Sequence, residues 1–220
     1  MTIADRSAAV RTPLVPAGYA FIIWAPLFLG LSMLAFWLTR PPGRTLGPGV
    51  ALPLIAILAL NGLWEVYVPL RGLDSGSAGI LFVSLLLSLG LSLRVAPCSA
   101  RNWQERWLLA LPILALAGWL TAAFFANLSS MLLASGVAWI DPNRLPVALT
   151  LLALLFALGF AMALRLASYA YVLPLVWALA AVTVSNVTWF ERYTIAVAAA
   201  LAGLILLAIP PIARLRRAQR

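Results

Sequence analysis

The apolar residues of this chain come in long uninterrupted runs, and this feature constrains the fold more than any other. A helix needs about 20 consecutive apolar residues to cross a bilayer core of roughly 30 Å. Seven segments have about that length or more, and only 10% of the residues are charged. Because the runs do not alternate apolar with polar residues, they argue against a transmembrane barrel. The sequence therefore predicts an all-α, polytopic integral membrane bundle of about seven transmembrane helices, with the lipid bilayer as its solvent.

Short segments rich in proline, glycine or aspartate separate the predicted spans. The spans are expected at residues 17–38, 50–70, 77–95, 107–133, 146–164, 169–187 and 193–213. The pair Pro210-Pro211 acts as a breaker near the end of the last span. The tightest connection lies around Arg165–Ser168, where spans five and six leave few residues for a turn. An error in the number of spans would arise there first.

Arginine is distributed unequally between the two predicted sides of the membrane. The N-terminal segment and the loops on its side hold five arginines, whereas the opposite loops and the C-terminal tail hold ten. Loops rich in arginine and lysine stay in the cytoplasm. We therefore predict a multi-pass protein of the cell membrane with its N-terminus outside and its C-terminus in the cytoplasm. The tail Arg214-Leu215-Arg216-Arg217 is interpreted as a stop-transfer anchor, with a lipid-binding motif as the alternative.

The composition also excludes several kinds of chemistry. The chain has no lysine, which excludes a retinal or pyridoxal Schiff base, and no histidine, which excludes bis-His haem ligation. The net charge of +9 comes from 15 arginines against six acidic residues, but no basic face with interleaved aromatic residues is present. We expect no nucleic-acid partner, no metal site and no cofactor.

Aromatic and amide side chains repeat at helical spacing on one face of spans one, two and four. Counted along each helix at about 1.5 Å per residue, these faces meet in one layer of the outer leaflet. An apolar pocket with a few orienting polar groups has this composition. The predicted ligand-binding residues are Phe21, Trp24, Phe28, Asn61, Trp64, Glu65, Trp119, Ala123 and Asn127.

Structural roles compete with this interpretation. Asn61 and Asn127 could simply hydrogen-bond between helices, a contact worth about 0.6 kcal/mol on average. Glu65 lies near a helix end, where it could reach water or pair with Arg71. Small residues such as Gly118 are expected to permit close packing of helices.

Three motifs in these spans resemble those of one known family. The first is Pro16-Ala17-Gly18-Tyr19-Ala20-Phe21-Ile22-Ile23-Trp24, and the second is Leu60-Asn61-Gly62-Leu63-Trp64. The third, looser motif consists of Pro112, Trp119, Ala123 and Asn127. In this order and spacing they resemble the TspO/MBR family, the translocator proteins or tryptophan-rich sensory proteins.

The resemblance covers roughly residues 13–133 and suggests how the single membrane domain is organised. Residues 1–133 would form a TspO/MBR-like four-helix portion, and residues 134–220 would add three helices and a basic tail. The first helix of the family, and the loop that lids its pocket, have no counterpart in the short N-terminus. Leu111-Pro112-Ile113 also replaces the usual Pro-Tyr of the family.

The resemblance implies a membrane receptor that binds tetrapyrroles, such as protoporphyrin IX, or other flat hydrophobic ligands. Some family members degrade protoporphyrin in light, using tryptophans that match Trp24 and Trp119. The alternatives are therefore a porphyrin-degrading enzyme and a small transporter. Because the sequence contains no nucleophile–base pair or phosphate-binding loop, an enzyme is not the favoured interpretation. A second copy of the chain, as in a homodimer, is a partner that the sequence leaves open.

Overall fold

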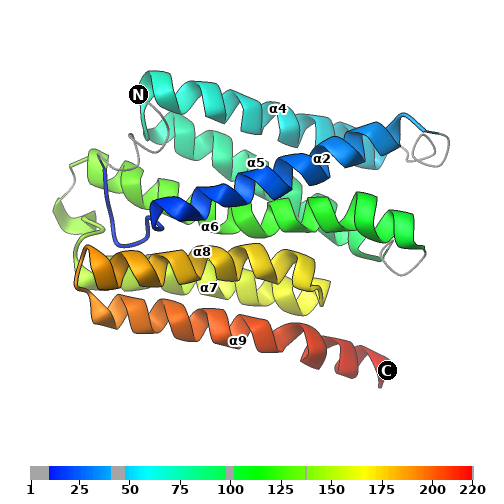
Figure 1. The fold of residues 1–220 in the computed structure, drawn as a ribbon. Coiled ribbons are helices and arrows are strands. Elements are labelled where there is room, and N and C mark those ends of the chain that lie inside the picture. Colours follow the sequence, from blue (N-terminus) through cyan, green and yellow to red (C-terminus); the bar gives the residue numbers. More distant parts are fainter. Residues whose placement is uncertain (1–9, 41–47, 98–101, 137, 220) are drawn as a thin grey trace.

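The computed structural model describes residues 10–40, 48–97, 102–136 and 138–219, which form a single helical bundle (Figure 1). Seven helices in this part of the chain are long and apolar enough to cross a membrane, as predicted. They are α2 (Trp24–Leu38), α4 (Pro48–Arg71), α5 (Ser75–Val95), α6 (Leu111–Ala134), α7 (Leu145–Leu166), α8 (Tyr169–Thr188) and α9 (Tyr193–Ala218). The 3₁₀ helix η1 (Gly18–Ile23) leads into α2, the π-helical turn η3 (Glu105–Ala110) leads into α6, and the 3₁₀ turn η4 (Ala138–Ile140) precedes α7.

The predicted spans agree with these helices within a few residues, except at the end of the chain. Helix α9 continues to Ala218, beyond the predicted end at residue 213, and includes both Pro210 and Pro211. The interpretation of this pair as a breaker was wrong. Each proline removes one intrahelical hydrogen bond, but membrane helices tolerate proline where neighbouring groups or water satisfy the freed carbonyls. Both prolines lie in the part of α9 nearest its basic end.

The connection between α7 and α8 is as tight as the sequence predicted. Ala167 ends α7 in the left-handed region, with φ of 50°, and its N–H donates to the Ala163 carbonyl over 2.9 Å. Ser168 then caps α8, because its hydroxyl accepts from the Ala170 N–H over 3.2 Å. Two residues are enough to reverse the chain, and the count of seven spans is confirmed.

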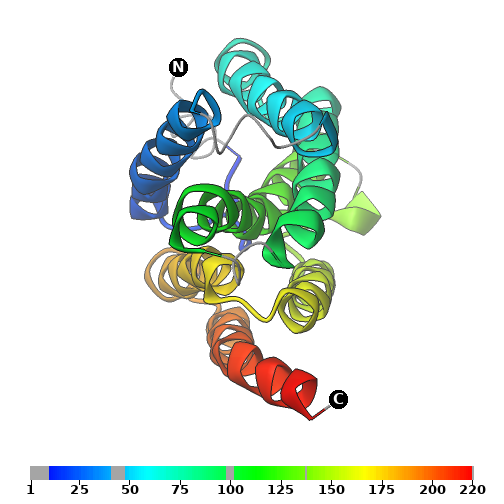
Figure 2. The same cartoon turned by 90° about the vertical axis from the view of Figure 1, so that its right-hand side faces the viewer.

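Helix α6 lies at the centre of the bundle. In its most apolar stretch 72% of the residues are buried, against 22% for α2 and α4. It packs against α2, α5, α7 and α8, and α8 in turn packs against α9 (Figure 2). Because successive helices run in opposite directions, the start of α2 and the end of α9 lie at opposite ends of the bundle (Figure 1). We call these the arginine-poor end and the arginine-rich end.

Helices α6 and α8 approach each other closely at Gly118. A Cβ atom at this position would lie 2.0 Å from the carbonyl oxygen of Tyr171. One turn along α6, the Thr121 hydroxyl lies 2.9 Å from the Tyr171 hydroxyl, and both side chains are fully buried. Small residues permit such backbone approach between membrane helices, as predicted for Gly118.

We predict that Gly118→Ala destabilises the bundle. The added methyl group forces α6 away from α8, and overpacking of this kind costs about 1–3 kcal/mol. Thermal unfolding of the detergent-solubilised protein should show a lower midpoint. Gly62→Ala is the matched control, because nothing lies within 4 Å of a Cβ there; its midpoint should stay the same or rise. Equal midpoints for the two variants would contradict the close packing at Gly118.

Candidate functional site

A segment of turns near the start of the chain, residues 10–17, enters the arginine-poor end of the bundle (Figure 1). We call this segment the strap. Helix α8 holds it along one side: the Asn186 amide donates to the Pro13 carbonyl over 2.7 Å. The Ser185 hydroxyl donates to the Val15 carbonyl over 3.0 Å. The Ala17 N–H donates to the Ala181 carbonyl over 3.1 Å.

Helix α6 holds the beginning of the same strap. The Thr12 and Ser129 hydroxyls lie 2.5 Å apart, and the Ser130 hydroxyl donates to the Val10 carbonyl over 3.1 Å. Thr12, Ser129 and Ser130 are almost completely buried. Buried backbone groups need hydrogen-bond partners, and here side chains of two helices supply them to a segment that is neither helix nor strand.

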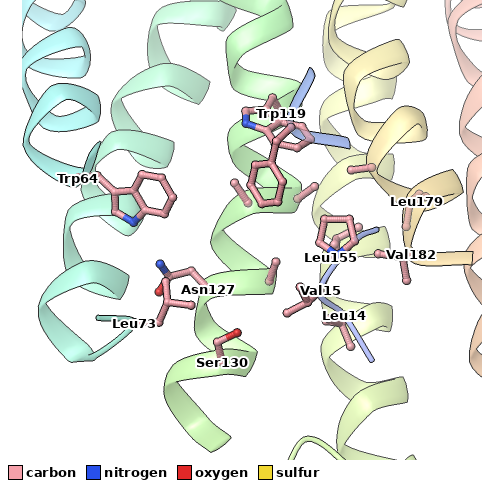
Figure 3. A pocket seen from close by; sticks show the side chains of 16 residues that line it. Leu14, Val15, Trp64, Leu73, Trp119, Asn127, Ser130, Leu155, Leu179 and Val182 are labelled. Carbon is pink, nitrogen blue, oxygen red and sulfur yellow. The ribbon is translucent and has the colours of Figure 1, made fainter. Parts of the chain in front are cut away.

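The strap closes one side of a small cavity inside the arginine-poor half of the bundle. The cavity has a volume of about 50 Å³, and its walls are almost entirely apolar. Figure 3 shows Trp64 and Leu73 on one side of it and Leu14, Val15 and Leu179 on the other. The lining residues are Leu14, Val15, Pro16, Phe21, Trp64, Leu73, Trp119, Ala122, Ala123, Ala126, Asn127, Ser130, Leu155, Ala178, Leu179 and Val182.

Two buried indole groups in the wall of this cavity have no hydrogen-bond partner. No acceptor lies within hydrogen-bonding distance of the Nε1 atom of Trp64 or of Trp119, although both side chains are at most 7% exposed. Leaving a buried donor unpaired costs about 1–3 kcal/mol. Because an indole N–H can only donate, each of these groups requires an acceptor.

Asn127 adds a third polar group to the cavity. Its Oδ1 lies 3.1 Å from the Ser77 hydroxyl, whereas its Nδ2 is buried without a partner. The Ser77 hydroxyl also donates to the Asp74 carbonyl over 2.8 Å, and a hydroxyl has only one proton to give. Whichever way the Asn127 amide is turned, one of its two polar atoms remains unpaired.

An aromatic cluster extends from the cavity to the surface of the bundle. The ring of Trp119 meets Phe21 edge-on at 6.2 Å and Trp24 edge-on at 6.1 Å between centroids. Trp24 in turn stacks on Phe28 at 5.1 Å, and the Phe28 side chain is 48% exposed. Trp24 therefore packs against Trp119, and Phe28 packs against Trp24 toward the surface of the bundle. Neither residue lines the cavity.

Five of the nine predicted ligand-binding residues line the cavity: Phe21, Trp64, Trp119, Ala123 and Asn127. Of the other four, Trp24 and Phe28 belong to the aromatic cluster, and Glu65 is half-buried on α4. Asn61 connects helices instead, because its amide donates to the Ile57 carbonyl over 2.8 Å and to the Ser84 hydroxyl of α5 over 2.9 Å.

Sequence reasoning missed the walls that the strap, α7 and α8 supply. Leu155, Leu179 and Val182 are ordinary apolar residues of predicted spans, and nothing in their spacing distinguishes them from residues that face lipid. A signal was present in the adjacent polar pair Ser185-Asn186 within an apolar span. Both side chains are fully buried, and both bind the strap.

The chain matches a known protein family over most of this architecture. The family model described as "TSPO-like protein" matches residues 1–210. The chain belongs to the TSPO-like family. Because the match continues beyond residue 133, the TSPO-like region includes α7, α8 and most of α9. Helices α7 and α8 supply two walls of the cavity. No curated protein and no solved structure matches the chain. A division of the TSPO-like domain at residue 133 remains a prediction.

We predict that Asn186→Leu loosens the strap although Asn186 lies outside the three motifs. The variant leaves the buried Pro13 carbonyl without its donor, at a cost of about 1 kcal/mol. The amides of Val15 and Ala17, bonded to Thr12 and Ala181, should then exchange hydrogen about fivefold faster. Hydrogen–deuterium exchange of peptides from the strap measures this. Asn61→Leu, which removes an amide from the α4–α5 contact, is the control and should leave strap exchange unchanged. Equal exchange in the two variants would show that Asn186 does not hold the strap.

Proposed function

We propose that this TSPO-like membrane protein is a receptor for a flat hydrophobic ligand that carries hydrogen-bond acceptors, a tetrapyrrole such as protoporphyrin IX. The proposed site is the cavity behind the strap. One observation carries the proposal: two buried tryptophans, Trp64 and Trp119, line an almost entirely apolar cavity, and their indole N–H groups have no acceptor. A ligand that brings carbonyl or carboxylate oxygens into an apolar site would satisfy both donors.

The aromatic composition of the wall favours a planar ligand. Phe21, Trp64 and Trp119 present ring surfaces to the cavity, and aromatic contacts are worth about 0.5–1.5 kcal/mol each beyond the area they bury. The chain has no histidine, the commonest proximal ligand of haem iron in globins and peroxidases. A metal-free tetrapyrrole with carboxylate side groups therefore fits the site chemically better than haem.

The size of the cavity adds a condition to this proposal. Pockets that enclose drug-sized ligands have volumes of about 300–1,000 Å³, whereas this cavity measures about 50 Å³. Ligand binding therefore requires one wall to move. The strap is the wall best able to do so, because it is not part of a helix and most of the hydrogen bonds that hold it come from side chains. Its displacement would couple ligand binding to the exposed residue Arg11 in the strap, as expected of a sensory protein.

We predict that protoporphyrin IX binds the detergent-solubilised protein saturably, at micromolar affinity or better. Trp64→Phe and Trp119→Phe keep an aromatic ring but remove the N–H donor, and each should weaken binding about three- to tenfold. The measurement is a porphyrin titration that follows quenching of tryptophan fluorescence. A porphyrin without carboxylate groups should bind more weakly to the wild type and respond little to either substitution.

The matched control for this titration is Trp37→Phe. Trp37 is also a buried tryptophan whose Nε1 lacks a partner, but it lies near the other end of α2 and does not line the cavity. Its substitution should leave affinity unchanged. Absence of saturable binding in the wild type would refute the tetrapyrrole proposal. Equal effects of all three substitutions would place the binding site elsewhere.

We also propose that the arginine-poor end, with the cavity, faces the outside of the cell membrane. The described arginines favour this orientation: Arg11, Arg71, Arg144 and Arg192 lie at that end, whereas the opposite end holds Arg40, Arg94, Arg106, Arg165, Arg214, Arg216 and Arg217. The more basic end of a membrane protein stays in the cytoplasm.

Reporter fusions test this orientation. An enzyme that is active only outside the cytoplasm should be active when fused to the N-terminus and inactive when fused to the C-terminus. A fluorescent protein that folds only in the cytoplasm should give the opposite pattern. The reversed result would place the cavity on the cytoplasmic side.

A further inference from the structure

The arginine-rich end of the bundle contains a second concave site, separate from the cavity behind the strap. This crevice has a volume of about 840 Å³ and shares no lining residue with the cavity. Its walls come from the end of α5, from η3 and the start of α6, from the α7–α8 turn and from the end of α9. Figure 2 looks onto this end, where the turn between α7 and α8 lies between α6 and α9.

Four arginines from three elements line the crevice. They are Arg106 of η3, Arg165 of α7, and Arg214 and Arg217 of α9. The described part of the arginine-rich end holds a single acidic residue, Glu105, and no carboxylate lines the crevice. Arg165, Arg214 and Arg217 thus gather in a wall that contains no acidic side chain.

Backbone carbonyls fix two of these arginines in position. The Arg214 Nε donates to the Ala167 carbonyl over 2.9 Å, and the Arg217 guanidinium donates to the Arg165 carbonyl. The Arg214 guanidinium also lies 5.7 Å from the centre of the Tyr169 ring. Because a guanidinium has five N–H donors, these contacts orient the group and still leave donors for an anion.

The remaining wall of the crevice is apolar and lies at the level of the membrane interface. Leu93, Leu111 and Leu114 form part of it. Two partly exposed aromatic residues, Trp107 and Tyr169, lie at its edge, with 56% and 38% of their surfaces exposed. Tryptophan and tyrosine are enriched where the hydrocarbon core meets the headgroups. The crevice therefore presents cations and an apolar surface side by side at headgroup depth.

We propose that this crevice binds an anionic phospholipid. Its phosphate would accept hydrogen bonds from the arginines, which match phosphate oxygens in pairs, and its acyl chains would lie along the apolar wall. A free phosphate or another soluble anion would use the same guanidinium groups but would gain nothing from the leucines. The apolar wall and the interfacial aromatics therefore favour a lipid. This site is independent of the function proposed for the cavity.

Native mass spectrometry of the full-length protein in detergent tests the proposal. The probes are phosphatidylglycerol, phosphatidylcholine and inorganic phosphate, each added to wild type and to two double variants. We expect wild type to retain one phosphatidylglycerol in preference to phosphatidylcholine. Arg165→Gln combined with Arg214→Gln should lower the fraction with bound phosphatidylglycerol at least fivefold.

The matched control is Arg40→Gln combined with Arg216→Gln. It removes the same charge from the same end of the bundle, but neither residue lines the crevice. Arg216 lies on α9 between the two lining arginines, and Arg40 lies over the Phe36 ring at 4.5 Å. This control should retain phosphatidylglycerol as wild type does. An equal loss of bound phosphatidylglycerol in both double variants would show that only the net charge of this end matters, and would overturn the proposal.

Two further outcomes would also overturn it. Equal retention of phosphatidylcholine and phosphatidylglycerol would show that the arginines do not recognise an anionic headgroup. Displacement of phosphatidylglycerol by millimolar inorganic phosphate would identify a site for soluble anions. If loss of the Arg214 contact unfolds the double variant, as a thermal scan without lipid would reveal, Arg165→Gln alone replaces it. The Arg165 side chain is exposed, and unchanged retention in that variant would refute the site.

Discussion

The strap and the cavity both depend on the contact between Gly118 of α6 and the Tyr171 backbone of α8. Lipid tails are as apolar as leucine, so membrane helices are held together by close packing and interhelical hydrogen bonds rather than by burial of apolar surface. At Gly118 the absence of a Cβ lets α6 approach the Tyr171 carbonyl directly. Helix α8 is thereby held against the central helix, and it carries both Asn186, which holds the strap, and Leu179, which lines the cavity.

The part of the fold that depends on local physics could be predicted from the sequence. Runs of apolar residues defined all seven helices, because the thickness of the bilayer fixes the length of a span. The predicted end of α9 at residue 213 was too early, because the helix continues through the basic residues Arg214, Arg216 and Arg217 to Ala218. Five of nine candidate site residues line the cavity, because aromatic and amide groups within a span are kept away from lipid.

The rest of the site depends on which helices are neighbours, and hydropathy does not encode this. Asn61 and Asn186 illustrate the limit, because both are amides inside apolar spans and both are buried. One binds a neighbouring helix through Ser84, and the other binds the strap through Pro13. Only the three-dimensional arrangement separates these two roles. For the same reason the apolar walls from α7 and α8 could not be distinguished from surfaces that face lipid.

The strap also has a consequence for the order in which the molecule is built. Val15 is held by Ser185, 170 residues later in the chain, and Pro13 by Asn186, 173 residues later. Ribosomes make a chain from its N-terminus at about 5–20 residues per second, so these partners are synthesised many seconds after the strap. Until α8 enters the membrane, the strap has no partner on that side. The cavity therefore acquires its closed form late in biosynthesis, and a chain truncated before α8 would lack it.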